Sequence, residues 1–226
     1  MGSCRTTLRP DELVRIGGDP NLAPKVLPHT TVGGGMTSFD VKAELHSYLR
    51  GARETLVWKL DGLSEYDIRR PLTPTGTNLL GLVKHSTATH IGYFGEVFGR
   101  ASDSLGRPAG DAGPAAEFWA TPDESSPDIV TGYRAAWDVS DATISELPLD
   151  AVGRVTWWGD ATVTLQQVLV HVTSETQRHA GHADIIRELI DGSAGLLNGL
   201  DNLHIRDPAE QQRFREQVEA AAREFT

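Results

Sequence analysis

Three polar side chains interrupt an otherwise apolar helical pattern in residues 163–190. Burial of an unpaired carboxylate is strongly unfavourable, so a buried glutamate needs a metal ion or a protonated histidine beside it. The pattern favours a metal ion beside Glu175. At spacings of three and four residues, the predicted inward-facing stripe is Leu165, Val168, Val172, Glu175, His179, His182, Ile186 and Leu189.

The spacing of these residues suits a shared metal ion. Glu175 and His179 are four residues apart, and such a pair projects from one face of a helix with Cβ atoms about 6 Å apart. His171 lies one turn before Glu175, and His182 lies one turn after His179. A catalytic divalent ion usually has three protein ligands and a position open for water or substrate. We therefore expect a third ligand from another element.

His85 is the predicted third ligand. It shares one side of a second predicted helix, residues 78–99, with Leu82, Thr89 and Gly92. A single histidine on an apolar face is more often a core or edge residue, but a Glu-His pair that lacks one ligand favours the metal interpretation. His90 lies about 140° around this helix from His85, so we assign it to the mouth of the site.

Aromatic residues precede the histidine-rich helix. The segment 154–158 is predicted to be extended and too short for a large sheet, and it ends in Trp157 and Trp158. The two indoles are predicted to line an apolar substrate pocket, with core packing of one of them as the equal alternative. We assign His171 to the same substrate-binding side.

Helical patterns over 38–63, 78–99, 128–147 and 163–190 predict an all-α up-down four-helix bundle in residues 36–192. Residues 1–35, rich in glycine and proline, are predicted to be a flexible, disordered N-terminal extension. Residues 193–226 are expected to be a linker and an extra C-terminal helix that begins at Pro208 and can serve a homodimer. Residues 101–127 are expected to be a long loop that Phe118 and Trp119 pin to the body.

The composition excludes several classes of protein. The chain has 226 residues, a net charge of -10 and a single cysteine, Cys4. One cysteine supplies neither a disulfide framework nor a thiolate metal cluster. The acidic balance argues against nucleic acid as a partner. No apolar segment reaches the ~20 residues that a membrane span requires, and no signal-peptide core is present. We expect a cytoplasmic protein with no membrane partner.

The arrangement of these motifs over residues 36–192 resembles the DinB-like four-helix bundle metalloproteins. The resemblance is carried by TGTNLLGLVKHSTATHIGYFGEVFG at 75–99 and by WWGDATVTLQQVLVHVTSETQRHAGHADIIRELIDG at 157–192. It is closest to the branch of mycothiol-dependent maleylpyruvate isomerases and thiol S-transferases, which bind a metal through two histidines and one glutamate. The matching positions are His85, Glu175 and His179.

This resemblance implies a metal-dependent enzyme that uses a low-molecular-weight thiol, such as mycothiol, on a small electrophilic substrate. Zinc is the expected metal, and nickel, iron or manganese suit the same ligands. His182 stands where many relatives carry glutamine, and His90 stands where close relatives carry glutamate. His182 is the predicted general base, with packing beside the ligands as the alternative.

Two other hypotheses fit the same residues. One is a metal-dependent hydrolase, cyclase or isomerase of secondary metabolism that needs no thiol. The other is a non-catalytic stress-response bundle protein in which Glu175 accepts hydrogen bonds from protonated His179 and His171 without a metal.

Overall fold

The computed structural model describes residues 40–100, 115–201 and 203–225. The predicted N-terminal extension, residues 1–35, and Cys4 lie outside the described residues. The chain divides into two compact units, Gly34–Leu203 and a second unit that includes His204–Thr226.

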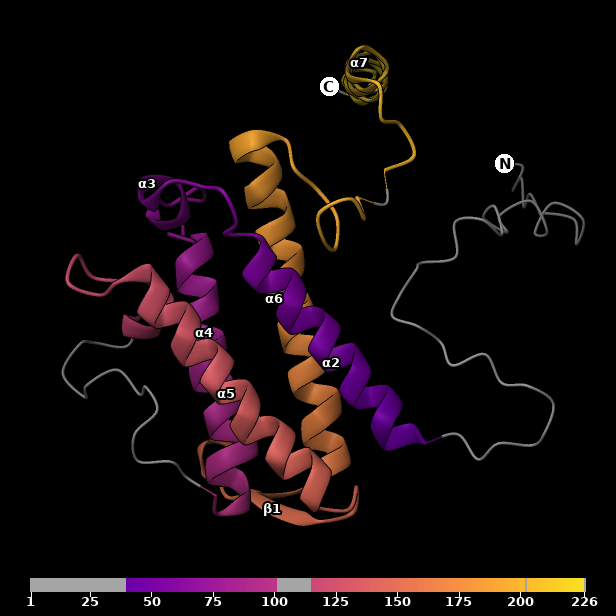
Figure 1. Ribbon diagram of the computed structural model, residues 1–226. Coiled ribbons are helices and arrows are strands. Elements are labelled where there is room, and N and C mark those ends of the chain that lie inside the picture. Colours follow the sequence, from indigo (N-terminus) through magenta and orange to yellow (C-terminus); the bar gives the residue numbers. More distant parts are fainter. Residues whose placement is uncertain (1–39, 101–114, 202, 226) are drawn as a thin grey trace, which may run out of the picture. The chain divides into compact units, whose positions relative to one another are not determined.

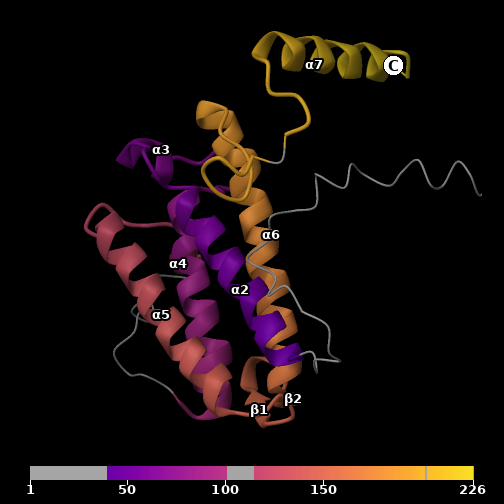
Figure 2. The same ribbon diagram turned by 45° about the vertical axis from the view of Figure 1, so that its right-hand side comes forward.

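Helices α2 (Val41–Trp58), α4 (Leu79–His90), α5 (Ser126–Glu146) and α6 (Leu165–Asp191) form a bundle (Figures 1 and 2). The predicted all-α bundle is therefore confirmed. Helix α2 packs chiefly against α6, and α4 packs chiefly against α5. Each helix begins at a side chain that accepts a hydrogen bond from a free backbone N–H of the first turn. These capping residues are Asp40, Asn78, Ser125 and Thr164.

Helices α4 and α5 run in the same direction, so the bundle does not simply alternate up and down. At one end Ser126, at the start of α5, donates to Glu65 of the short helix α3 (Glu65–Arg69), which precedes α4. At the other end the Thr143 hydroxyl donates to the Phe94 carbonyl at 2.8 Å. The end of α4 and the start of α5 therefore lie at opposite ends of the bundle.

A two-stranded antiparallel hairpin lies at the end of the bundle where α6 begins (Figure 1). Strands β1 (Val152–Val155) and β2 (Ala161–Thr164) pair from Val152 with Thr164 to Val155 with Ala161. Trp157 and Trp158 do not continue the strand as predicted; they lie in the 3₁₀ turn Thr156–Trp158 between the strands. Gly159 and Asp160, both with positive φ, complete the reversal.

The inward face of α6 differs from the predicted stripe. Leu189 is 68% exposed, so its predicted core position is wrong. Glu175 and His179 are half-buried, and His182 is exposed. The residues that are buried along the helix are Leu165, Val168, Leu169, Val172, Thr176, Ala180, Ala183, Ile186 and Arg187. A 3.6-residue period drifts against a fixed stripe over a helix this long, which leaves Glu175 and His179 at the edge of the buried face.

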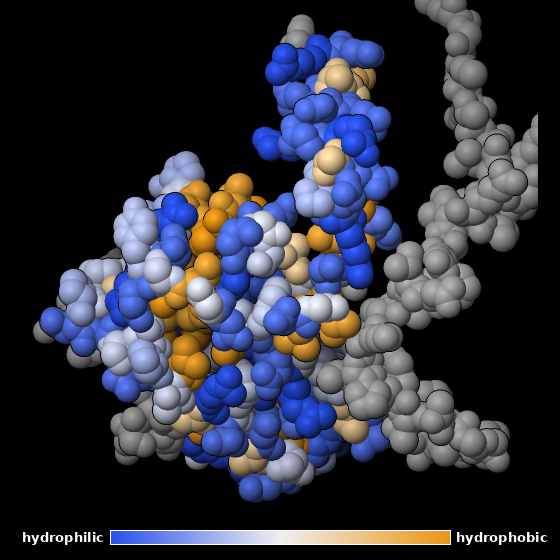
Figure 3. Space-filling view, turned by 45° about the horizontal axis from the view of Figure 1, so that its top comes forward, coloured by the Kyte–Doolittle hydropathy of each residue, from blue (hydrophilic) through white to orange (hydrophobic). Residues whose placement is uncertain are grey.

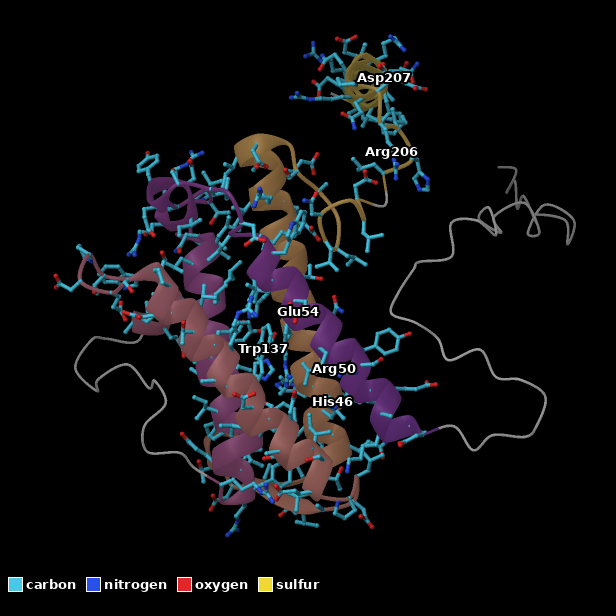
Figure 4. The ribbon with its side chains drawn as sticks, in the orientation of Figure 1. His46, Arg50, Glu54, Trp137, Arg206 and Asp207 are labelled. Carbon is cyan, nitrogen blue, oxygen red and sulfur yellow. The ribbon has the colours of Figure 1, made fainter. Side chains whose placement is uncertain are left out.

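A buried cation joins α2 to α5. The Arg53 side chain is 1% exposed, and its Nη1 lies 2.6 Å from Asp141 Oδ1. His46 Nε2 lies 2.8 Å from the same oxygen. Figure 4 labels His46 on α2. Burial alone would raise the pKa of Asp141, but hydrogen bonds from His46 and Arg53 and the charge of Arg53 outweigh it and lower the pKa to about 2.

The second unit contains helix α7 (Pro208–Arg223), which Asp207 caps. The predicted start at Pro208 is confirmed. No residue of α7 is buried, and Phe214 and Val218 are 54% and 55% exposed. In the space-filling view of the described surface, apolar residues gather in patches on a mostly hydrophilic background (Figure 3). Within the described residues, no helix combines the length and apolar character needed to span a bilayer.

Asp141→Ala should lower the free energy of unfolding by about 2 kcal/mol, because it leaves the buried Arg53 cation unpaired. This magnitude is below the usual cost of breaking a fully buried pair, since the Asp141 side chain is 39% exposed. Urea unfolding measures the change. The control is Glu146→Ala, which removes a 60% exposed partner of Arg100 and should cost less than about 0.5 kcal/mol. Equal losses in the two variants would contradict the prediction.

Candidate metal and substrate site

Helices α4 and α6 bring His85 and His179 together. Their ring centroids are 4.9 Å apart, and the ring planes are nearly perpendicular at 81°. Both ring nitrogens of His179 are buried and lack a hydrogen-bond partner among the described residues. Burial, and after it the proximity of His85, lowers the pKa of His179 to about 4, although the nearby Glu175 opposes the shift. At neutral pH, His179 is therefore the neutral imidazole that binds metals.

Glu175 and His85 both line a cavity of about 260 Å³. The cavity lies between α4 and α6, with walls also contributed by the hairpin and by the segment that precedes α5. Its lining residues are His85, Ala88, Thr89, Gly92, Tyr93, Glu96, Glu117, Trp157 and Glu175. The structure thus places His85 beside His179 and places Glu175 on the same cavity as His85, whereas His179 is not among the residues that line this cavity.

In the part of the chain that the structure describes, no group of three His, Cys, Asp or Glu side chains stands in an arrangement ready to hold a metal ion. The chemistry of the donors nevertheless fits a divalent cation, because two neutral imidazoles and one carboxylate form a common catalytic ligand set. The buried, unpartnered nitrogens of His179 are the observation that supports this fit, since buried polar atoms normally have partners.

Aromatic side chains line the end of the cavity nearest the hairpin. The Tyr93 ring centroid lies 5.3 Å from that of Trp157, 5.6 Å from that of Trp158 and 4.9 Å from that of His171. His171 Nε2 lies 3.1 Å from the Tyr93 hydroxyl. Trp157 and Trp158 are 45% and 38% exposed, so neither fills the core. This geometry supports a substrate wall.

His182 and His90 lie outside this cavity lining. His182 is exposed, and its ring centroid is 5.8 Å from that of His179. His90 is fully buried in the bundle, where its Nδ1 lies 3.0 Å from Ser140 Oγ and its ring packs against Tyr133. The structure therefore does not bring His90 to the predicted mouth of the site. Burial, reinforced by the Arg53 charge, holds the pKa of His90 well below 6.5.

Two residues of the site were not predicted from the sequence. Tyr93 follows His85 and Thr89 along one side of the helix, and this spacing was a usable signal. Glu117 lies within the stretch expected to be a loop, where no periodicity indicates which way a side chain points. Its carboxylate lies 3.3 Å from His85 Nδ1.

The fold has a counterpart among solved structures. A crystal structure of a conserved protein from Enterococcus faecalis superposes with a TM-score of 0.53 at 15% sequence identity, covering 69% of this chain and 99% of that chain. At this identity the likeness shows the fold alone. A search of curated proteins found no match.

The sequence matches the model of the mycothiol S-transferase family over residues 44–192, which is more than half of the chain. The bundle, with its histidine pair between α4 and α6, is thus of the DinB-like class, as the sequence motifs predicted. The chain belongs to the mycothiol S-transferase family.

The burial of His90 predicts that the free energy of unfolding falls as pH falls below about 6.5. In this range His90 binds a proton in the unfolded state but stays neutral in the folded state. Each such proton contributes a slope of up to about 1.4 kcal/mol per pH unit. His90→Gln keeps a hydrogen-bonding side chain and removes the titration. Urea unfolding between pH 7 and pH 5 should show a shallower slope in this variant. Parallel curves would refute the prediction.

Proposed function

We propose that this chain is a metal-dependent mycothiol S-transferase that joins the thiol sulfur to a small electrophilic substrate. Membership of the family supports the thiol and the transfer. The observation that supports a bound metal is that both nitrogens of His179 are buried and lack a partner among the described residues. The ring centroid of His179 lies 4.9 Å from that of His85. His85, Glu175 and His179 would hold the ion, with zinc first among the candidates.

The non-catalytic alternative requires hydrogen bonds that the geometry does not provide. In that hypothesis a protonated His179 donates to Glu175. Neither nitrogen of His179 has a hydrogen-bond partner among the described residues, and burial keeps its pKa near 4. His171 contacts the Tyr93 hydroxyl through Nε2. His179 is therefore a poor cationic partner for Glu175 in the absence of a metal.

The roles of the other residues follow from their positions. A bound zinc-like ion lowers the pKa of a thiol and so supplies a thiolate near neutral pH. The thiol proton must leave sulfur before the S–C bond forms, and His182, one turn beyond His179, is the proposed acceptor. On an electrophile with a polarised double bond or a strained ring, the electron pair of the bond that opens then takes this proton back, so no separate leaving group is formed. Tyr93, Trp157 and Trp158 bind the electrophile by stacking against a planar group and excluding water.

Substitution of His179 tests the metal site. The purified chain, prepared without a polyhistidine tag, should contain about one divalent ion per molecule, and His179→Ala and Glu175→Ala should lose it. Elemental analysis measures both. His204→Ala, which removes an exposed histidine of the second unit, is the control and should keep the metal. Normal metal content in His179→Ala would reject the assignment.

The thiol requirement separates a transferase from a hydrolase, cyclase or isomerase on the same site. Parallel assays contain mycothiol, glutathione or no thiol with a panel of neutral, planar electrophiles. Product should form only with mycothiol, and removal of the metal by a chelator should abolish it. Turnover at the same rate without any thiol would select the alternative.

His182→Ala should lower kcat by about 10²- to 10⁴-fold, the usual contribution of a general base, and leave the metal content unchanged. His182→Gln separates proton transfer from packing, because glutamine fills a similar space but accepts no proton. A wild-type rate in His182→Gln would show that the imidazole only packs beside His179.

A further inference from the structure

The segment of residues 115–124, here called the strap, is fastened to α4 by several side chains. Asn78, the capping residue of α4, donates through Nδ2 to the Phe118 carbonyl at 3.0 Å. Lys84 donates to the Trp119 carbonyl at 3.0 Å and forms an ion pair with Glu124 at 2.7 Å. These contacts hold the strap over the same turns of the helix that carry His85.

Further contacts fix the far end of the strap and its distance from α4. Arg69 donates to the carbonyls of Thr121 and Glu124 at 3.1 and 2.7 Å. Gly81 permits the close approach, since a Cβ at this position would lie 1.9 Å from the Phe118 carbonyl oxygen. The path of the strap is therefore fixed by contacts from two parts of the chain, α3 and the first turns of α4.

The strap places two side chains against His85. The Phe118 ring stacks on the imidazole with centroids 4.3 Å apart and an interplanar angle of 20°. On the ring edge, Glu117 Oε1 lies 3.3 Å from Nδ1, which is an ion-pair distance without the alignment of a hydrogen bond. The other nitrogen, Nε2, lies 3.5 Å from the hydroxyl of Thr89, which lines the cavity.

We propose that Glu117 is a positioning residue for His85. Its carboxylate favours the tautomer with the proton on Nδ1, Phe118 restricts rotation of the ring, and Nε2 is left as the nitrogen available to a metal. A carboxylate behind a metal-binding histidine fixes ring orientation and raises the basicity of the ligand nitrogen. This inference rests on the proposed metal site, which it extends to a residue outside the triad.

The test measures the affinity of the full chain for Zn²⁺ by competition with a chromophoric chelator. Glu117→Ala should weaken binding about 10- to 100-fold, the usual cost of losing such a partner. Glu117→Gln should lose less, because its amide oxygen keeps a partial negative charge beside Nδ1. Asp123→Ala, which removes an exposed carboxylate from the same strap, is the matched control and should bind like the wild type. Thermal melting confirms that each variant is folded.

Two further measurements separate positioning from other roles. The visible spectrum of the Co²⁺-loaded protein should shift in Glu117→Ala and in Phe118→Leu, since both free the His85 ring. Gly81→Ala should produce the same weakening as Glu117→Ala, because it displaces the strap without touching the carboxylate.

The outcomes distinguish this inference from the proposed function. A wild-type chain that binds no metal overturns both. Wild-type affinity in Glu117→Ala overturns the positioning role alone. Complete loss of metal in Glu117→Gln, equal to the loss in His85→Ala, would instead make Glu117 a direct ligand and overturn the positioning role as well.

Discussion

The close approach of His85 and His179 is the contact on which the candidate site depends. The two residues are separated by ninety-four positions in the chain, and only the packing of α4 and α6 in one bundle brings their rings to 4.9 Å. The approach also has a cost, since it buries two imidazoles beside each other and drives the pKa of His179 to about 4. A neutral, unpartnered imidazole held by a rigid helix is a poor structural element and a good ligand. This contrast is the physical reason for proposing a metal site at His85 and His179.

The rest of the bundle resists distortion at that contact. The bundle has two apolar clusters. One surrounds Phe94 and Leu169 toward the hairpin, and the other surrounds Leu80 and Tyr133 toward α3. Between them the buried Arg53 holds α2 to α5 through Asp141. His90, which was expected at the mouth of the site, belongs to this internal network, so one face of α4 carries the candidate ligand His85 and another belongs to the core.

The helices could be predicted from the sequence because they leave periodic signals, and Glu175 and His179 stand out as candidate ligands for the same reason. The capping residues Asn78 and Thr164 and the helical spacing of Glu175 and His179 are local features that a single sequence displays. The strand pairing of the hairpin, the parallel course of α5 and the approach of Glu117 to His85 are long-range contacts, for which no local pattern exists. Leu189 shows the same limit within a helix, since a small error in phase accumulates along α6 until an apolar residue faces solvent.

The hairpin between α5 and α6 has an evolutionary consequence. Its reversal is completed by Gly159 and Asp160 in left-handed conformations, and Trp157 and Trp158 at its tip pack against Tyr93. The candidate ligands, in contrast, lie on the helices of the bundle. Substitutions at the tip therefore alter the aromatic wall without altering the residues proposed to hold the metal, so the proposed selectivity and the proposed chemistry can evolve separately.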